Sequence, residues 1–452
     1  MTAEIDYLKR AWDYSEDDEI ALKQIYAYLF SYFGFTDHKD KDIVKASNFV
    51  GSDHSSKPFL SSEKATGSSI SFSSDEETKV NLSASDDIKS RFKTLGGYEG
   101  VLEQAHKGKS KKHHKHFHTH NHHHKALQKH DPSDLFISFI LFPRNENFDI
   151  IIKRFFVARK KKVDDVLEMM AKNLDWRINS HQVDRWVNGG DAEVFFKGNS
   201  PQFIDAFKIN QAFLRGRDKI GRPIVVIHVK DHLGKNCPER EFEKFICILI
   251  EWTRFNLSSL QEGVDKACLL FDMTGFSLKN ADFAAIKFLA TAFEANYPEC
   301  LGAIWIHSAP WVFNAVWKVI RGWLDPVVAL KIHFTKTAED LEAFVSREYI
   351  PKSLGGDDEF NMKYKNPTHE DNEKPKDERY KELIEERDDL IISFFETTNR
   401  WLQAKSVAES DKYLQNRLIL SVKLAQNYIE LDPYIRKRSI FERIGEMKEI
   451  GY

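Results

Sequence analysis

The chain has 452 residues and a formal net charge of −3, with 42% hydrophobic and 30% charged residues. This length allows two or three domains with sizeable cores, and the near-balanced charge argues against a general nucleic-acid-binding protein. The cysteines stand singly in apolar runs without CxxC spacing, which favours reduced core residues of an intracellular protein over a disulfide or zinc framework. These cysteines are Cys237, Cys247, Cys268 and Cys300.

The N-terminal segment is acidic and lacks the basic start of a signal peptide. No apolar run approaches the roughly eighteen residues of a membrane span, so we expect a soluble protein with peripheral membrane contact at most. Between Ile20 and Phe33 apolar residues recur at helical spacing, which predicts an amphipathic helix within residues 1–33. Its expected partner is the C-terminal part of the same chain, and a membrane face is the alternative.

Residues 34–130 are predicted to form a disordered linker. Up to residue 105 the segment is rich in serine and poor in aliphatic clusters, and residues 106–130 hold ten histidines and seven lysines without a carboxylate. A solvated linker is the simplest interpretation of this His/Lys tract. A pH-sensitive attachment to anionic lipid is an alternative, and a metal site is the least favoured because no second shell is evident.

Residues 131–185 are predicted to form a helical lobe. Residues 150–157 are apolar on one face, a basic run covers 159–162, and residues 163–176 have the spacing of a further helix. Cations at a helix end also suit the helix dipole, so a solvated helix end is the alternative to an anion-binding role for this run.

Residues 186–358 have the alternation of an α/β domain with a mainly parallel sheet. A turn at 219–223 leads into a β-branched strand at 224–229, and a helix with one apolar face follows at 239–260. Short apolar runs at 267–272 and 302–307 flank a helix at 283–297, the pattern of a βαβ unit with parallel strands. A further strand is expected near residue 330.

A very apolar helix is predicted between Pro310 and Pro326. Ten of the fourteen residues from Trp311 to Leu324 are apolar. The polar residues Asn314, Lys318 and Arg321 fall on one narrow stripe. A buried core helix would have this composition, and so would a helix that faces alternately a cavity and a membrane.

After Gly356 the composition turns charged, and two helical patterns follow, at 380–394 and 414–429. Residues 359–452 are therefore predicted to form a C-terminal helical hairpin that packs on the body.

No catalytic constellation stands out in the sequence. There is no GxSxG elbow, no Walker loop and no GxGxxG after a strand. Asp272 and His307 each end a strand, and we interpret them as a turn cap and a hydrogen-bonded structural histidine rather than as catalytic groups. The sequence therefore predicts a protein that is not an enzyme and needs no cofactor or metal.

Ordered motifs give the sequence a family resemblance. They are Phe271-Asp-Met-Thr-Gly275, Tyr297-Pro-Glu-x-Leu-Gly302, Ala309-Pro, Trp323-Leu-Asp-Pro326 and Ile350-Pro-Lys-Ser-Leu-Gly-Gly356. Together they resemble the CRAL-TRIO lipid-transfer family, in particular the divergent yeast phosphatidylinositol transfer proteins. The resemblance covers residues 147–358 and implies an α/β lipid-binding domain with an apolar pocket, a gate helix and a helical N-terminal lobe.

The resemblance also implies site residues. The family's basic residue in the N-terminal lobe matches Lys160, beside Arg159, and its later lysine matches Arg321, which keeps the charge. The position of its acidic headgroup partner is aligned with Phe288. The gate helix and pocket are expected to use six aromatic and aliphatic residues: Phe288, Trp311, Phe313, Trp317, Ile320 and Trp323.

The resemblance implies a monomeric, cytoplasmic carrier that contacts endosomal or microsomal membranes transiently. Its ligand is expected to be phosphatidylinositol, with a second lipid left open. Three alternatives also stay open: a carrier of an apolar isoprenoid or sterol-like ligand, a lipid hydrolase, and a lipid-sensing regulator of lipid metabolism.

Overall fold

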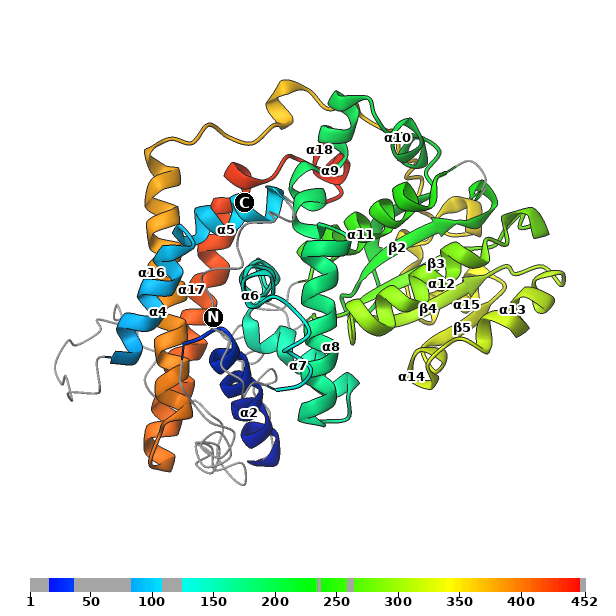
Figure 1. The fold of residues 1–452 in the computed structure, drawn as a ribbon. Helices are drawn as coiled ribbons and strands as arrows, with labels where there is room; N and C mark the ends of the chain where they lie inside the picture. Colours follow the sequence, from blue (N-terminus) through cyan, green and yellow to red (C-terminus); the bar gives the residue numbers. More distant parts are fainter. Residues whose placement is uncertain are drawn as a thin grey trace, which may run out of the picture. The chain divides into compact units, whose positions relative to one another are not determined.

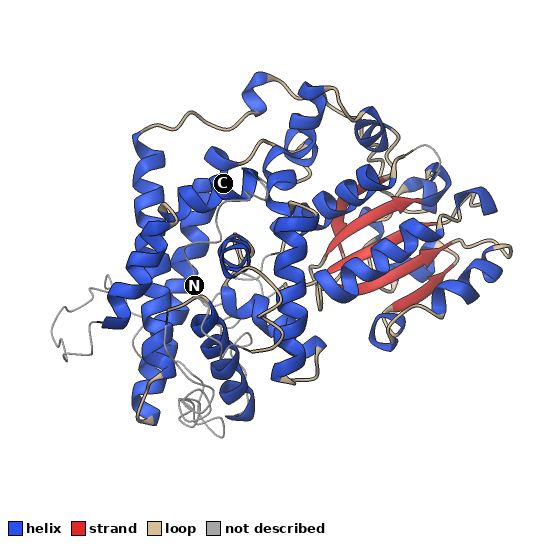
Figure 2. Cartoon of the chain, viewed as in Figure 1, coloured by secondary structure: helices blue, strands red, loops and turns tan. Residues whose placement is uncertain are grey.

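The computed structural model describes residues 16–35, 83–107, 124–232, 234, 237–257 and 264–447 (Figures 1 and 2). The chain divides into two compact units. Unit 1 comprises Met1–Ser180 with Lys381–Tyr428, and unit 2 comprises His181–Tyr380 with Ile429–Tyr452. Both units are therefore built from segments that are distant in the sequence.

Unit 1 is helical in its described part (Figure 2). Its helix α6 begins at Pro132 because the Asp131 side chain accepts hydrogen bonds from the N–H groups of Ser133 and Asp134, at 2.9 and 3.1 Å. The helices are α2 (Glu16–Tyr32), α4 (Ser83–Thr94), α5 (Gly97–Lys107), α6 (Pro132–Leu141), α7 (Phe148–Ala158), α8 (Val163–Asp175), the π-helical turn Trp176–Ser180, and most of α16 (Glu378–Leu402) and α17 (Val407–Ile435).

The N-terminal helix α2 is buried on nearly every face. The rings of Tyr26 and Phe30 pack edge-on against Trp401 and Phe395 of α16, with centroids 6.4 and 5.4 Å apart. The Lys23 Nζ donates to the Ser410 Oγ of α17 at 2.8 Å. The C-terminal part of the chain is therefore a partner of this helix, as predicted. The predicted amphipathic pattern is wrong, because polar side chains of the helix such as Lys23 are buried as well.

Helices α16 and α17 form an antiparallel hairpin. The Asn427 amide donates to the Leu383 carbonyl at 3.0 Å, and near the other end the Arg417 Nε donates to the Thr398 Oγ1 at 2.9 Å. The Arg417 guanidinium also reaches Asp149 of α7 at 2.7 Å, and both side chains are fully buried. The predicted hairpin is therefore present and packs on the N-terminal helices of unit 1.

The predicted disorder of residues 34–130 is wrong over residues 124–130, where Leu127 is fully buried, and over residues 83–107, which form α4 and α5. Their few apolar residues are spaced so that each finds a partner surface: Ile88, Phe92 and Tyr98 are at most 1% exposed. The backbone N–H of Tyr98 donates to the Asp388 carboxylate of α16 at 2.7 Å. A segment with few apolar residues can therefore be ordered when those residues pack against other helices of the same unit. Residues 36–82 and 108–123, with most of the His/Lys tract, lie outside the described residues.

Unit 2 is an α/β domain, as the sequence predicts. Its five-stranded sheet has the order β1-β2-β3-β4-β5, with β1 antiparallel to β2 and the remaining neighbours parallel. The strands are β1 (Ala212–Arg217), β2 (Pro223–His228), β3 (Ala267–Asp272), β4 (Leu301–His307) and β5 (Ile332–Thr335). The α-helices are α9 (Val183–Lys197), α10 (Pro201–Lys208), α11 (Glu239–Phe255), α12 (Phe283–Thr291), α13 (Phe313–Arg321), α14 (Pro326–Ala329), α15 (Ala338–Glu342) and α18 (Ile440–Arg443). Short 3-10 turns lie at Val229–Asp231, Leu278–Asn280, Arg347–Tyr349, Lys352–Leu354 and His369–Asp371, and a π-helical turn lies at Ala292–Asn296.

The strand β1 is one of the elements that the sequence pattern does not reveal. Its Arg215 is a charged residue within a strand, and the structure neutralises it with Asp358 and Glu446, both within 2.9 Å. These carboxylates come from much later in the chain, so no local pattern could have indicated that Arg215 would be accommodated.

Candidate functional site

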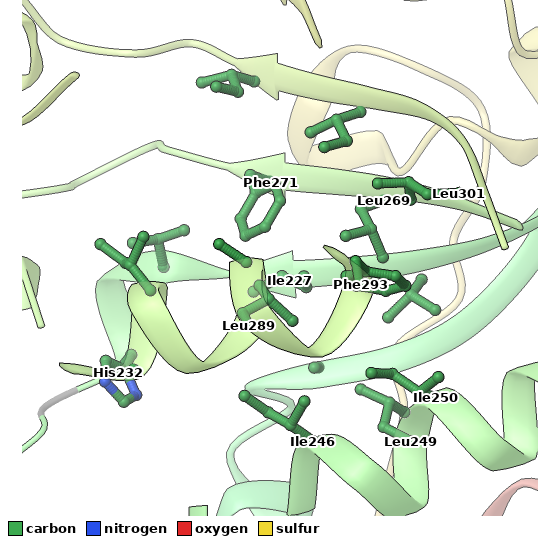
Figure 3. Close-up of a pocket in the computed structure, with 18 of the residues that line it drawn as sticks. Ile227, His232, Ile246, Leu249, Ile250, Leu269, Phe271, Leu289, Phe293 and Leu301 are labelled. Carbon is green, nitrogen blue, oxygen red and sulfur yellow. The ribbon is translucent and has the colours of Figure 1, made fainter. Parts of the chain in front are cut away.

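An apolar cavity of about 230 Å³ lies over one face of the sheet in unit 2. The helices α11, α12 and α13 contribute its other walls. Figure 3 shows Leu269 and Phe271 of β3 on the sheet side, with Leu289 of α12 and Leu249 of α11 across from them. Apart from a few polar groups at its ends, the cavity is lined by aliphatic and aromatic side chains.

Strand periodicity explains the sheet wall. Because successive side chains point to opposite faces, alternate residues of three adjacent strands meet in register on one face. One such row is Val225, Leu269 and Ile304, and the next is Ile227, Phe271 and Ile306. The opposite face carries larger residues such as Trp305, which is fully buried.

The apolar face predicted for the helix at 239–260, now α11, contacts two different parts of unit 2. Phe242, Phe245 and Leu249 line the cavity. Trp252 packs instead against Phe441 of α18, with ring centroids 5.6 Å apart. One helix face therefore serves both the cavity and the solid core of the unit.

Helix α13 covers the cavity with one face. Phe313, Trp317 and Ile320 line it, whereas Lys318 and Arg321 are exposed. The helix is shorter than the predicted span of 311–324, since the N–H of Trp323 turns back to the Ile320 carbonyl at 2.9 Å. The predicted polar stripe is therefore the outer face of a short lid.

The other residues expected in the gate and pocket lie outside the cavity. Trp311 is 84% exposed, and Trp323 packs edge-on against Phe283 with centroids 5.7 Å apart. Phe288 stacks on the His181 ring at 5.8 Å and is not part of the lining.

The predicted headgroup cations fall in different units. Arg159 and Lys160 follow α7 in unit 1, where Lys160 has a left-handed backbone with φ 50°. Their neighbour Lys161 is paired with Asp18 of α2 at 2.6 Å. Arg321 ends α13 in unit 2. The pairing of Lys160 with Arg321 around one phosphate stays a prediction.

A cluster of charged residues that the sequence reasoning missed lies at the amino edge of the sheet. Lys266 precedes β3, Glu299 precedes β4 and Lys331 precedes β5, so three adjacent parallel strands bring them together. The Glu299 carboxylate lies 3.6 Å from the Lys266 Nζ and 3.9 Å from the Lys331 Nζ. Burial lowers the pKa of Lys331, although Glu299 acts in the opposite direction.

This amino-edge cluster adjoins the cavity. Ala267, Cys300 and Ile332, each next in sequence to one of its members, line it. Glu299 has φ 56°, a left-handed conformation that costs a non-glycine residue free energy and is often seen at functional positions. The signal was available in the sequence, because Glu299 belongs to the quoted Tyr297-Pro-Glu motif and Lys331 follows the Trp323-Leu-Asp-Pro326 motif closely.

A second polar cluster lies at the carboxyl edge of the sheet. The His232 ring is within hydrogen-bond distance of Gln211 through Nδ1, at 2.6 Å, and of Asp282 through Nε2, at 3.0 Å. All three residues line the cavity, and His232 is the one labelled side chain in Figure 3 that carries nitrogen. Burial raises the pKa of Asp282, but hydrogen bonds from the Ala285 N–H and His232 outweigh it and leave that pKa below its usual value.

The two residues weighed as catalytic groups have structural partners. The Asp272 carboxylate accepts the N–H of Thr274 at 2.9 Å, as a turn cap does, and the His307 Nδ1 lies 2.9 Å from the Thr335 Oγ1. Burial lowers the pKa of His307. Within the described ranges no three His, Cys, Asp or Glu residues are grouped to hold a metal ion. Nor does any helix of the part that the structure describes have the length and apolar character to cross a membrane.

A mainly parallel sheet with helices over an apolar cavity is an arrangement suited to enclosing a hydrophobic ligand. The comparisons with known proteins agree. The model of the CRAL/TRIO domain matches residues 208–356. The chain is 41% identical over 302 residues to the phosphatidylinositol transfer protein CSR1 of Eremothecium gossypii, a match that covers 66% of this chain and 68% of that protein.

Two further relatives extend the likeness. A CRAL-TRIO domain-containing protein of Schizosaccharomyces pombe is 30% identical over 437 residues, covering 96% of this chain and 91% of the relative. The Sec14 cytosolic factor of the same organism is 25% identical over 221 residues, covering 46% and 74% respectively. The chain belongs to the CRAL-TRIO family of lipid-binding proteins, as its motifs predict.

Proposed function

We propose that this protein carries phosphatidylinositol between membranes without altering it, with the acyl chains in the apolar cavity and the headgroup at the amino-edge cluster. The observation that carries the proposal is the continuity between an apolar cavity and Lys266, Glu299 and Lys331 at its edge. The name of the relative from Eremothecium gossypii supports the choice of lipid.

The energetics of acyl chains explain why a carrier needs an enclosed cavity. Two eighteen-carbon chains hold roughly 32 methylenes, and at about 0.8 kcal/mol for each buried methylene their exposure to water costs on the order of 25 kcal/mol. Loading and release are therefore expected on the membrane, where the chains never cross water.

The amino-edge cluster offers the groups that a phosphoinositol headgroup requires. Lysine ammonium groups form charge-assisted hydrogen bonds with phosphate oxygens, and a carboxylate accepts hydrogen bonds from the inositol hydroxyls. Lys266 and Lys331 already flank one carboxylate oxygen of Glu299, so a phosphate would compete for the same ammonium groups. Arg321 on α13, with Arg159 and Lys160, is retained as a second set of headgroup cations.

Helix α13 is proposed as the gate. Its inner face meets the cavity through Phe313 and Trp317, and Trp311 and Trp323 beside it present aromatic rings that suit the membrane–water interface. We infer a monomer that visits endosomal or microsomal membranes from the cytoplasm through this surface, with no cofactor.

The transfer test uses donor and acceptor vesicles with fluorescent phosphatidylinositol. Replacing both Lys266 and Lys331 by alanine removes about two charge-assisted hydrogen bonds, each worth about 1.5–3 kcal/mol, so transfer should fall at least about a hundredfold at an unchanged melting temperature. Lys197→Ala is the matched control, because it removes an exposed lysine that is also paired with a glutamate. Undiminished transfer by the double variant would exclude the amino-edge cluster as the headgroup site.

A parallel double variant, Lys160→Ala with Arg321→Ala, tests the cations taken from the family resemblance. Loss of transfer in this variant alone would place the headgroup there instead. The recovered lipid should be unaltered in every arm, and its conversion to lysolipid or diacylglycerol would favour a hydrolase.

A further inference from the structure

The helices α4 and α5 of unit 1 are joined by a glycine turn that rests on a half-buried acid of α16. Gly96 and Gly97 have φ values of 83° and 63°, the left-handed conformation that glycine adopts at little cost. A Cβ added at Gly97 would collide with the Asp388 carboxylate, so the turn and the acid are in direct contact. The Tyr98 N–H also donates to the Oδ1 of Asp388 at 2.7 Å. The side chain of Asp388 is therefore part of the interface between α5 and α16.

Apolar side chains hold the rest of this helical pair in place. Ile88 and Phe92 of α4 and Val101 of α5 are at most 1% exposed. The Phe92 ring lies edge-on to Phe136 of α6, with ring centroids 6.5 Å apart. These contacts do not change with pH, whereas the charge of a carboxyl group at the interface does. The strength of the attachment should therefore follow the ionisation of Asp388.

The charged groups around Asp388 come from both elements of the contact. Glu99 of α5 and Asp389 of α16 are like charges, and Arg387 of α16 is the opposite charge. The Arg387 guanidinium is shared, because it donates to a backbone carbonyl of α17 at 3.1 Å and lies over the Tyr98 ring at 4.3 Å. Burial, together with the two carboxylates, raises the pKa of Asp388 to about 6, although the Tyr98 N–H and Arg387 act against it. An ionised Asp388 is therefore disfavoured while α5 is in place.

We propose that the α4–α5 pair is a clip on unit 1 that closes in acid and opens more often near neutral pH, with Asp388 as the group that titrates. In the closed clip a neutral carboxyl group lies beneath Gly97 without repelling Glu99 or Asp389. Ionisation places a poorly solvated charge beside two like charges, and movement of α5 about the glycine turn returns that charge to water. The clip belongs to unit 1 and uses no group of the cavity in unit 2, so the inference goes beyond the proposed lipid transfer.

The direction and size of the effect follow from the two states of Asp388. In the open clip the solvated side chain should titrate near pH 4, the ordinary value for an aspartate. The proton then stabilises the closed clip fully below about pH 4, and this contribution is lost as the pH rises through about 6. Between pH 5 and pH 7 the equilibrium constant for opening should rise at most about ninefold, and about three- to sixfold after screening by solvent.

Hydrogen exchange of the full chain at pH 5 and pH 7, corrected for the intrinsic exchange rates, measures the opening directly. The amides of α5 should lose about three- to sixfold of their protection between the two pH values. The amides of α7, which lies in the same unit, serve as the internal reference and should keep theirs. Equal pH dependence of α5 and α7, or none in α5, would overturn the proposal.

The variant Asp388→Asn assigns the effect to this side chain. Asparagine keeps the shape and a carbonyl acceptor for the Tyr98 N–H but does not ionise, so the protection of α5 should no longer depend on pH. Glu103→Gln is the matched control, because Glu103 is an exposed carboxylate of α5 that is paired with Lys107 at 3.0 Å. This control should retain the pH dependence of the wild type. A pH dependence that persists unchanged in Asp388→Asn would refute the role of this residue.

A second variant keeps the test informative if Asp388→Asn does not fold. Glu99→Gln combined with Asp389→Asn removes both like charges and leaves Asp388 in place. The midpoint of the pH-dependent opening should then move to lower pH, because the closed clip holds an ionised Asp388 at a smaller cost in free energy. Such a shift would support the clip, and an unmoved midpoint would contradict it.

Discussion

The interiors of the two units are organised in opposite ways. In unit 1 the interior is filled: Phe30, Phe136 and Phe148 surround Phe395 with ring centroids 5.4 to 6.1 Å away, and buried ion pairs such as Arg417 with Asp149 lie nearby. In unit 2 the sheet and its helices leave a cavity of about 230 Å³. In a filled interior, a substitution that changes side-chain volume lowers stability. In an interior with a cavity, the same kind of substitution can change the ligand that the cavity accepts with little effect on stability.

The largest expected effect comes from removing a ring from the filled interior. Phe395→Ala should lower the free energy of unfolding by about 3–5 kcal/mol, because the side chain is fully buried and its neighbours can collapse only partly. The matched change in the hollow unit, Leu289→Ala, should cost about 1 kcal/mol, because Leu289 already faces a cavity. Urea denaturation of lipid-free protein measures both, and equal costs would contradict the contrast.

Adding volume should separate the two interiors in the same sense, with the larger loss of stability again in the filled unit. Ala27→Leu in α2 overpacks a site that is 1% exposed and should cost about 1–3 kcal/mol. Ala290→Leu points into the cavity and should change stability by less than about 1 kcal/mol while reducing the lipid that co-purifies with the protein. Mass spectrometry of the extracted lipid, beside a melting curve, checks this pair. A large stability loss from Ala290→Leu would show that the cavity is too small to accept the added side chain.

The smallest effect concerns a charge in the filled unit. Burial raises the pKa of Asp388 to about 6, although the Tyr98 N–H acts against it. In the unfolded chain an aspartate titrates near pH 4, so the folded state binds this proton more tightly. The resulting contribution to the free energy of unfolding is fully present below about pH 4 and is lost as the pH rises to about 6. A rise of about two pKa units corresponds to about 3 kcal/mol, and solvent screening at this half-buried carboxylate reduces it. Relative to Asp388→Asn, the wild type should therefore lose about 1–2 kcal/mol of unfolding free energy across this window.

Unfolding curves at several pH values test that prediction. Glu385→Gln is the control, since Glu385 is an exposed carboxylate on the same helix. A constant difference between the wild type and Asp388→Asn from pH 4 to 7 would contradict the raised pKa.

What the sequence could predict followed from local periodicity. The strands near 224, 268 and 303 and the apolar helix before Pro326 lie where their patterns place them, because alternation and helical spacing are properties of short segments. Ordered motifs then identified the family. Helical spacing alone also assigns Lys318 and Arg321 to one face of α13, and both are exposed there.

The candidate site was less predictable because it depends on contacts between distant segments. Lys266, Glu299 and Lys331 meet only when three strand starts are aligned, and Gln211 reaches His232 only through the antiparallel strand β1, whose charged residues conceal it. The expected disorder failed at α4 and α5 for the same reason, since their partner surfaces come from elsewhere in unit 1. Phe288 was placed in the site by alignment alone, and its ring stacks on His181 instead.

The burial of α2 against α16 has a consequence for how the chain is made. During synthesis α2 leaves the ribosome about 370 residues before its partner is complete. At about 5–20 residues per second this interval is on the order of half a minute, in which Ile25, Leu29 and Phe30 have no finished surface to cover them. Unit 1 cannot complete its fold until Lys381–Tyr428 has been made. A nascent chain paused before α16 should therefore expose an apolar helix that a chaperone can bind.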